Sequence, residues 1–213
     1  TGFVGQVDAN STFAAVAANN NTLFAGGVVT GTVNNKNIAG IVAYDLPSNS
    51  FPSVQPPALQ GNNVTVNAIA PRPKSDEIYV GGRFQSGGDF TCPGLCMWNS
   101  GSSQWNRPNN NVAGIVNALI WTSETTLLVA GNLTFGENKT TILQFDHTKN
   151  EFTEIPGANN LPGPVTALTV ANQNGDQLWA TGTSVDGTVY LQRFDSSKWV
   201  SVDSSLFGSG TDI

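Results

Sequence analysis

Short apolar segments recur along the chain in the same order four times, at a period of about 50 residues. The first segment of each unit is small and apolar: Phe13–Ala17, Val66–Ala70, Val116–Ile120 and Val165–Thr169. A second apolar segment follows about ten residues later and ends in glycine, at Gly27, Gly82, Gly131 and Gly182. Each segment has the length of a β-strand, and the polar stretches between them have the composition of turns.

Aromatic residues mark the second half of each unit. A third segment ends in an aromatic residue and then Asp or Asn: Tyr44-Asp45, Trp98-Asn99, Phe145-Asp146 and Phe194-Asp195. After a polar turn, a fourth segment begins with an aromatic residue: Phe51, Trp105, Phe152 and Trp199. The pattern therefore predicts four strands in each of four units.

A single four-stranded sheet cannot bury both of its faces, so such units stack face to face, and radial stacking gives a propeller. We predict an all-β fold: a kelch-like β-propeller of four-stranded antiparallel blades, in one domain over residues 1–213. The repeats cover approximately residues 13–65, 66–115, 116–164 and 165–213. A β-sandwich is the alternative, but it needs no such period. The four blades either close a ring or belong to a larger one, as a strand at Phe3–Val7 and a connector at Leu206–Ile213 would suggest.

Composition supports strands and turns over helices. Charged residues make up 11% of the chain, against roughly 25% in ordinary soluble domains, and Asn, Ser, Thr and Gly replace them. The net charge is −6 and the nine basic residues are scattered, which argues against nucleic-acid binding. The sequence has no apolar run near the length of a membrane span, so we expect membrane contact only through segments outside this chain.

Cys92 and Cys96 flank Pro93 and Gly94, which can turn the chain tightly. A disulfide that closes a short loop is the favoured prediction. The alternatives are free or buried thiols and a zinc site. Zinc normally needs four ligands, and the only histidine, His147, lies far along the chain, so we expect no metal and no cofactor.

Acid/base chemistry by Asp45, Asp146 and Asp195 is one candidate activity, because paired carboxylates hydrolyse glycosides. The second unit carries Asn99 at the same position, and an amide can cap a turn but cannot transfer a proton. These residues are therefore predicted to cap turns. His147 lies in the same kind of turn, and the chain is predicted not to be an enzyme.

Five Asn-x-Ser/Thr sequons are candidates for glycosylation: Asn10, Asn20, Asn63, Asn132 and Asn138. A chain this rich in Asn, Ser and Thr would contain about four by chance. Several fall in predicted turns, where a glycan would leave the strand ladders undisturbed.

The segment Arg83–Met97 is longer than its counterpart in the fourth unit, and binding residues are often found in loops that depart from a rigid scaffold. It is the candidate partner-binding loop, through Arg83, Phe84, Phe90, Pro93 and Leu95. The alternative is that it only covers the edge of a blade and buries Phe84 and Phe90.

The same segment carries a resemblance. Val80–Phe84, Cys92–Asn99, Trp105, Val116–Leu119 and Leu128–Leu133 resemble the fungal Rax family of cortical polarity markers, and the similarity covers roughly Phe13 to Ile213. The resemblance implies a large, glycosylated, single-pass membrane protein whose repeat-bearing ectodomain marks bud or growth sites.

On this resemblance we expect a non-catalytic protein-interaction module on the extracellular face of the plasma membrane. Its partners would be other cell-surface or polarity proteins, and cell-wall glycans as a further class. The alternative is a carbohydrate-binding or sugar-processing propeller, for which Trp121 and Trp179 are the aromatic candidates.

Overall fold

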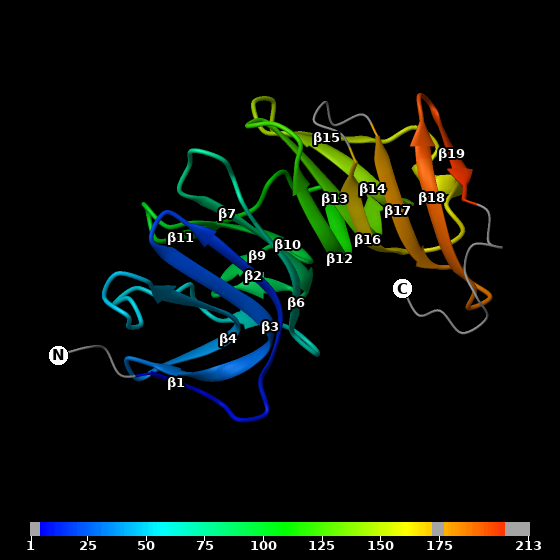
Figure 1. The fold of residues 1–213 in the computed structure, drawn as a ribbon. Helices are drawn as coiled ribbons and strands as arrows, with labels where there is room; N and C mark the ends of the chain where they lie inside the picture. Colours follow the sequence, from blue (N-terminus) through cyan, green and yellow to red (C-terminus); the bar gives the residue numbers. More distant parts are fainter. Residues whose placement is uncertain (1–4, 172–176, 203–213) are drawn as a thin grey trace.

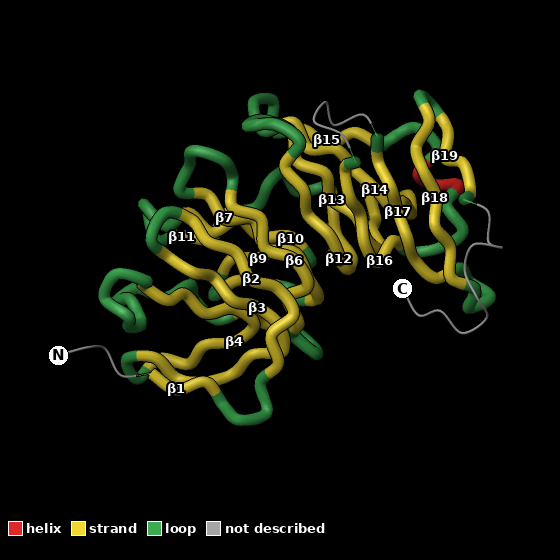
Figure 2. The backbone as a smooth tube through the Cα atoms, in the orientation of Figure 1, coloured by secondary structure: helices red, strands yellow, loops and turns green. Residues whose placement is uncertain are grey.

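Antiparallel sheets account for most of the structure, a computed structural model that describes residues 5–171 and 177–202. Four four-stranded sheets follow one another in chain order, and a small three-stranded sheet is attached to the second (Figures 1 and 2). The sheets lie side by side in a row, the first at one end and the fourth at the other. The predicted all-β fold with four-stranded antiparallel blades is confirmed.

The first blade departs from the predicted pattern. It consists of β2 (Thr12–Asn19), β3 (Thr22–Val33) and β4 (Lys36–Asp45), with β1 (Gly5–Val7) paired to the far end of β3. The prediction of a strand opened by Phe51 is wrong: the chain makes only isolated bridges at Ser50, which pairs with Asp45, and at Phe51, and Pro52 then removes a ladder donor. The β3–β4 hairpin is long, and Gly31–Val33 at the far end of β3 pair with β1. β1 therefore belongs to the first blade and not to another one.

The other three blades each have the four predicted strands, with the fourth strand at Trp105, Phe152 and Trp199. The second blade contains β6 (Thr65–Pro71), β7 (Glu77–Arg83), β10 (Leu95–Asn99) and β11 (Gln104–Asn106). The third contains β12 (Val112–Trp121), β13 (Thr126–Phe135), β14 (Asn138–Asp146) and β15 (Glu151–Glu154). The fourth contains β16 (Val165–Val170), β17 (Leu178–Thr183), β18 (Val189–Asp195) and β19 (Lys198–Ser201), after a short 3-10 helix, η1 (Ala158–Asn160).

A β-bulge recurs at the same place in every blade. The pairing of the first two strands shifts by one residue at Phe13/Ala15, Val66/Ala68, Val116/Ala118 and Val165/Ala167. The bulge brings a backbone carbonyl against the glycine that ends the second strand, so that a Cβ at Gly82 would meet the carbonyl of Thr65. This close approach explains why each second segment ends in glycine.

Second-strand side chains alternate between the two neighbouring blades. Ile78 and Val80 pack with Phe24 of the first blade, whereas Tyr79 between them packs toward the third blade. The third blade repeats the pattern: Leu127 and Val129 face back, and Leu128 and Ala130 face forward. Each blade therefore buries both faces only when it has a neighbour on each side.

Polar side chains also connect neighbouring blades. The Asn67 side-chain amide donates to the Val116 carbonyl at 3.0 Å and to the Asn117 side-chain oxygen at 3.1 Å. Asn117 then donates to the Val165 carbonyl of the fourth blade at 2.7 Å. A ladder of two asparagines thus joins the innermost strands of three blades.

The Asx residues that end the third strands cap turns, as predicted. The backbone N–H groups of Ser48, Ser102 and Thr148 donate to the side chains of Asp45, Asn99 and Asp146 respectively, each at 2.9 Å. The Thr148 hydroxyl and the Lys149 side chain are the main causes that lower the pKa of Asp146 from its ordinary value of 3.8 to about 2. Asp195 is the exception among the described turns: its carboxylate accepts from the Ser196 hydroxyl at 3.3 Å.

Removing the Asn117 side chain should weaken the stack. In Asn117→Ala, the Val165 carbonyl loses its donor and Asn67 loses an acceptor, so we expect the free energy of unfolding to fall by about 1–3 kcal/mol. Urea unfolding measures the change. Asn62→Ala, at an exposed turn, is the matched control and should change it by less than about 0.5 kcal/mol; equal losses in the two variants would contradict the role of the ladder.

The Asp146 turn predicts a defined acid response. Because the pKa of the folded form lies below the ordinary value, the ionised carboxylate stabilises the fold above about pH 4, and this contribution disappears as the pH falls toward about 2. Melting temperatures measured between pH 2 and pH 5 should show a shallower slope in Asp146→Asn and in Asp146→Ala. At pH 7 both variants should be less stable than the parent, and the alanine variant should lose more because it also lacks an acceptor for the Thr148 N–H. In the control, Asn99→Ala, stability should drop while the slope stays that of the parent; an unchanged slope in Asp146→Asn would refute the prediction.

Candidate functional site

The segment between β7 and β10 folds as an insert on the second blade. It contains β8 (Ser86–Gly87) and β9 (Phe90–Thr91), which extend a small sheet begun by β5 (Leu59–Gln60) in the connection from the first blade. Backbone hydrogen bonds fix its two ends, from Gln85 N–H to the Gln60 carbonyl at 2.7 Å and from Gly94 N–H to the Phe84 carbonyl at 3.0 Å. The insert is thus a built surface with its own backbone ladder.

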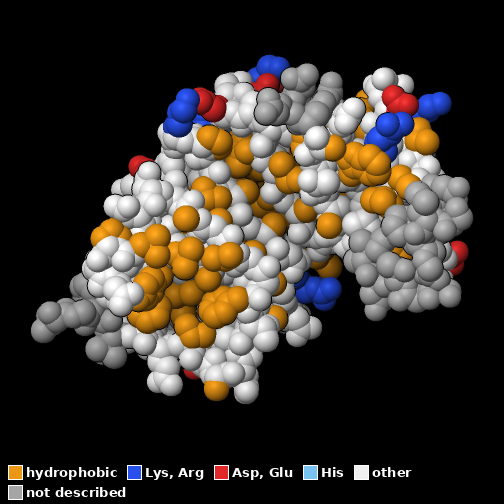
Figure 3. Space-filling view, in the orientation of Figure 1, with side chains coloured by type: hydrophobic (Ala, Val, Ile, Leu, Met, Phe, Trp, Pro, Cys, Tyr) orange, Lys and Arg blue, Asp and Glu red, His pale blue; other side chains and the backbone are white. Residues whose placement is uncertain are grey.

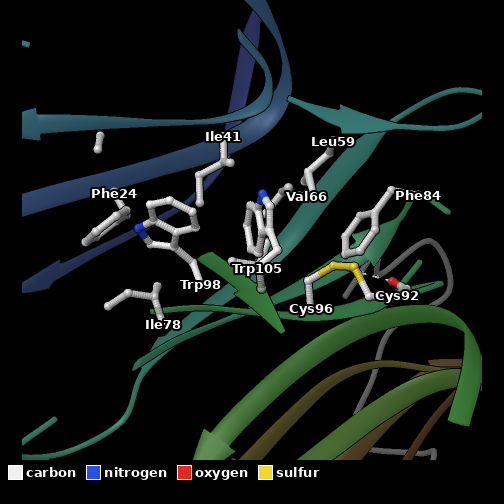
Figure 4. Packing of buried hydrophobic residues seen from close by; sticks show 12 residues of the cluster. Phe24, Ile41, Leu59, Val66, Ile78, Phe84, Cys92, Cys96, Trp98 and Trp105 are labelled. Carbon is white, nitrogen blue, oxygen red and sulfur yellow. Dashed lines mark hydrogen bonds between the residues drawn. A yellow bond between two sulfur atoms is a disulfide. The ribbon is translucent and has the colours of Figure 1, made fainter. Parts of the chain in front are cut away.

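A disulfide closes the insert, as predicted. Cys92 and Cys96 are bonded with their Cα atoms 5.3 Å apart, and both are fully buried. Figure 4 shows them beside Phe84 and Trp105, in the hydrophobic cluster shared by the first two blades. Gly94 has φ 77°, and a Cβ there would meet the carbonyl of Gly114 in the third blade. The cysteine loop is therefore part of the core and not a loose appendage.

The five residues predicted to contact a partner separate into two groups. Phe84 and Leu95 are buried and cannot contact a partner without unpacking the core. Arg83 and Phe90 are exposed, and Pro93 is half-buried. The insert thus buries Phe84, as the covering interpretation expected, but it exposes Phe90, and partner binding by this loop stays a prediction.

Phe90 stands at the edge of an open hollow. The hollow has a volume of about 610 Å³, and its lining includes Pro57, Asp89, Phe90, Trp105 and Asn106. Only 6% of Trp105 is exposed, and its indole N–H donates to the Pro57 carbonyl at 2.9 Å. Trp105 also packs edge-on against Trp98, with ring centroids 5.4 Å apart. The hollow therefore combines a fixed aromatic floor with an exposed aromatic rim, whose phenylalanine keeps 43% of its surface accessible.

His147 forms a contact between blades that the sequence did not indicate. Its Nε2 lies 2.9 Å from Oε2 of Glu77, and the same oxygen accepts from Arg72 at 3.1 Å. Arg72 also donates to the Glu124 carbonyl of the third blade at 2.9 Å. Within the described residues, no group of three or more His, Cys, Asp and Glu side chains is placed to hold a metal ion.

The two tryptophans considered for sugar binding do not share a surface. Trp121 packs edge-on against Tyr79, with ring centroids 5.1 Å apart, and donates to the Ala70 carbonyl at 3.2 Å. Trp179 lies on β17 between Leu178 and Ala180, which face the third blade, so it points away from that blade. The structure thus places them on different blades and facing in opposite directions.

All five sequon asparagines are exposed. Asn20 and Asn63 lie in turns with φ of 51° and 55°, Asn10 lies in the turn before β2, and Asn132 and Asn138 lie on β13 and β14. Each side chain is therefore accessible in the folded domain. Among the described residues, no helix has the length and apolarity needed to cross a membrane.

Solved structures share the fold at low sequence identity. The extracellular domain of a putative hybrid two-component system from B. thetaiotaomicron aligns with a TM-score of 0.57 and 13% identity, over 91% of this chain and 25% of that one. A chain of the mitotic checkpoint complex aligns with a TM-score of 0.53 and 16% identity, over 92% and 65% of the two chains. At these identities the similarity concerns the fold alone.

Curated relatives are fungal. Polarized growth protein L1 of Phoma sp. is 55% identical over all of this chain, which spans 16% of that protein. Polarized growth protein RAX2 of Candida albicans is 27% identical over 80% of this chain, which corresponds to 13% of the relative. Bud site selection protein RAX2 of Saccharomyces cerevisiae is 29% identical over 54% of the chain. The family model described as the Rax2 C-terminal beta propeller domain matches residues 41–213. Since this match covers most of the chain, the chain belongs to the Rax2 family and corresponds to its C-terminal beta propeller domain.

Proposed function

We propose that this domain is a non-catalytic protein-interaction module, carried on the extracellular face of the plasma membrane by a larger polarity marker. Relatives named for polarized growth and bud site selection support the polarity role. The outer face of the cell is supported by the buried disulfide, because such bonds persist mainly outside the reducing cytosol. Five exposed sequon asparagines, candidates for glycosylation in the secretory pathway, are consistent with the same location.

The hollow between Phe90 and Trp105 is the observation that carries the proposed binding role. Exposed aromatic side chains beside a rigid floor act as anchors at protein interfaces, because they bury much area and lose little conformational entropy. The partner we propose is another cell-surface or polarity protein that inserts an apolar side chain beside Phe90. Cell-wall glycans are the second partner class.

The polar residues that could perform acid/base chemistry have structural partners. Asp45 and Asp146 accept backbone N–H groups in turns, and His147 is held by Glu77 across two blades. A carboxylate that caps a turn keeps a low pKa, as Asp146 does, and is poorly suited to protonate a leaving group. These assignments support a binding role over hydrolysis.

Phe90 should be required for partner engagement. In the full-length parent protein, Phe90→Ala removes the anchor and should weaken binding to the partner by about tenfold or more, with loss of the marker from growth sites. Fluorescence localisation of the tagged parent protein and affinity measurement with the purified domain check this. Val185→Ala is the matched control, since Val185 is the most exposed large apolar residue among the described ones and lies on the fourth blade.

The result of the Phe90 experiment separates the two partner classes. Normal localisation of Phe90→Ala would contradict the proposed surface. Tight sugar binding that is lost in Phe90→Ala but not in Val185→Ala, measured on a glycan array, would favour the glycan class instead.

The disulfide should contribute to stability and resist reduction in the folded state. It closes a loop between residues four apart, for which the chain-entropy relation gives about 2 kcal/mol. Cys92→Ser combined with Cys96→Ser should lower the free energy of unfolding by about that amount, measured in urea. Because both sulfurs are buried, thiol alkylation of the native domain in dithiothreitol should be slower than after unfolding; rapid alkylation of the native domain would contradict a core position.

A further inference from the structure

The first blade exposes an apolar face on the side turned away from the second blade. Phe13 is 53% exposed and Val16 is 65% exposed, both on β2. Figure 3 shows hydrophobic side chains gathered over β2, β3 and β4 on this side of the molecule. Leu23 and Ala25 of β3 lie on the same face and are only half-buried. Contiguous apolar surface of this kind normally marks an interface.

The repeat shows what this face is built to contact. Phe13 occupies the position held in the other blades by Val66, Val116 and Val165, whose exposed fractions are 0%, 1% and 0%. Each of these valines packs against the preceding blade: a Cβ on Gly26 would lie 2.6 Å from Val66, and one on Gly81 would meet Val116. Phe13 has the position of a residue that inserts into a preceding blade.

The second strand gives an independent match. Leu23 and Ala25 hold the positions of Ile78 and Val80 in the second blade, which face back toward the first blade and are fully buried. Leu127 and Val129 hold them in the third blade and are fully buried as well. Leu178 and Ala180 hold them in the fourth blade and are buried too, so in all three described interfaces these positions are covered by the blade that comes earlier in the chain.

We infer that a further four-stranded blade, formed by about 50 residues of the parent polypeptide that come before this chain, covers the face containing Phe13, Val16, Leu23 and Ala25. Blades stack in chain order throughout the described structure, which places the unit that comes before the first blade next to this face. A later blade that closes the ring is the other possible neighbour in a propeller, and a Val16→Lys effect that appears only in a chain extended beyond residue 213 would assign the face to that blade and overturn the inference. The fourth blade lies at the opposite end of the row (Figure 1). The relatives supply ample length, because this chain spans only 16% of the Phoma protein.

The interface also specifies the sequence of the occupant. Gly26 and Gly81 leave room for Val66 and Val116, and Ala130 shares a cluster with Val165. A residue facing Phe13 must be at least as small, so we expect glycine at that position of the occupant's second strand. Two residues earlier, Phe24, Tyr79 and Leu128 fill the space against the next blade, so a large apolar side chain should precede the glycine by two and pack on Leu23.

The inference is tested by making the same substitution in two chains of different length and comparing its effect on the melting temperature. Val16→Lys is made in the 213-residue domain and in a chain extended by the preceding unit of the parent protein, with Val185→Lys as control in both. In the short domain Val16 is exposed, so both variants should keep the parent melting temperature to within about 2 °C. In the extended chain, Val16→Lys should lower the melting temperature by at least about 5 °C because a charge is buried in an interface, whereas Val185→Lys should not.

Two further experimental outcomes and one property of the parent sequence would overturn the inference. A Val16→Lys shift that is the same in both chain lengths would show that no preceding blade covers the face. Size-exclusion chromatography with light scattering supplies the other: a dimeric short domain that Val16→Lys converts to a monomer, with no added effect in the extended chain, would assign the face to a second copy. The parent sequence should also contain, about 50 residues before Gly26, a glycine preceded two residues earlier by a large apolar residue. Its absence would contradict the inference.

Discussion

The packing of one four-stranded sheet against the next is the constraint on which the structure depends. Each second strand alternates side chains between two neighbours, so Tyr79 is buried only because the third blade is present, and Ile78 only because the first is. Hydrophobic burial therefore occurs between repeats more than within them, as in other linear arrays of repeats. Glycine at the bulge, as in Gly82, follows from the same geometry, because the bulged strand brings a carbonyl where a Cβ would lie.

The candidate binding surface is built on this packing and depends on it. Trp105, the floor of the hollow, belongs to the cluster that joins the first two blades, and its indole is fixed by the Pro57 carbonyl in the connection between them. The disulfide lies in the same cluster. Phe90 is therefore presented from a surface whose supporting residues come from two blades, which keeps the rim in a defined position before any partner arrives.

The sequence predicted the features that recur and missed those that depend on a single contact. The four-strand pattern, the terminal glycines and the Asx caps repeat every 50 residues or so, and repetition separated structure from chance: Asn99 in place of Asp showed that the position caps a turn. The prediction of a strand beginning at Phe51 was wrong because it followed the repeat and did not take account of Pro52, which lacks the N–H that a strand ladder needs. The contact between His147 and Glu77 joins residues 70 apart in the chain, and no local pattern marks such a pair. The Asn67 and Asn117 positions recur in the first segments, and two asparagines on innermost strands were a signal that could have been used.

Unequal numbers of neighbours give the blades unequal stability, and this bears on where binding can occur. In a linear stack, a blade with two interfaces is held more firmly than a blade with one, since the energy is approximately a sum of nearest-neighbour terms. The second and third blades have two described neighbours each, and the asparagine ladder joins the second blade through the third to the fourth. The insert with Phe90 is attached to the second blade and is closed by a buried disulfide. The insert, which departs from the repeat, is thus carried by one of the two described blades that have a neighbour on each side. A loop held in this way can bind a partner without first becoming ordered.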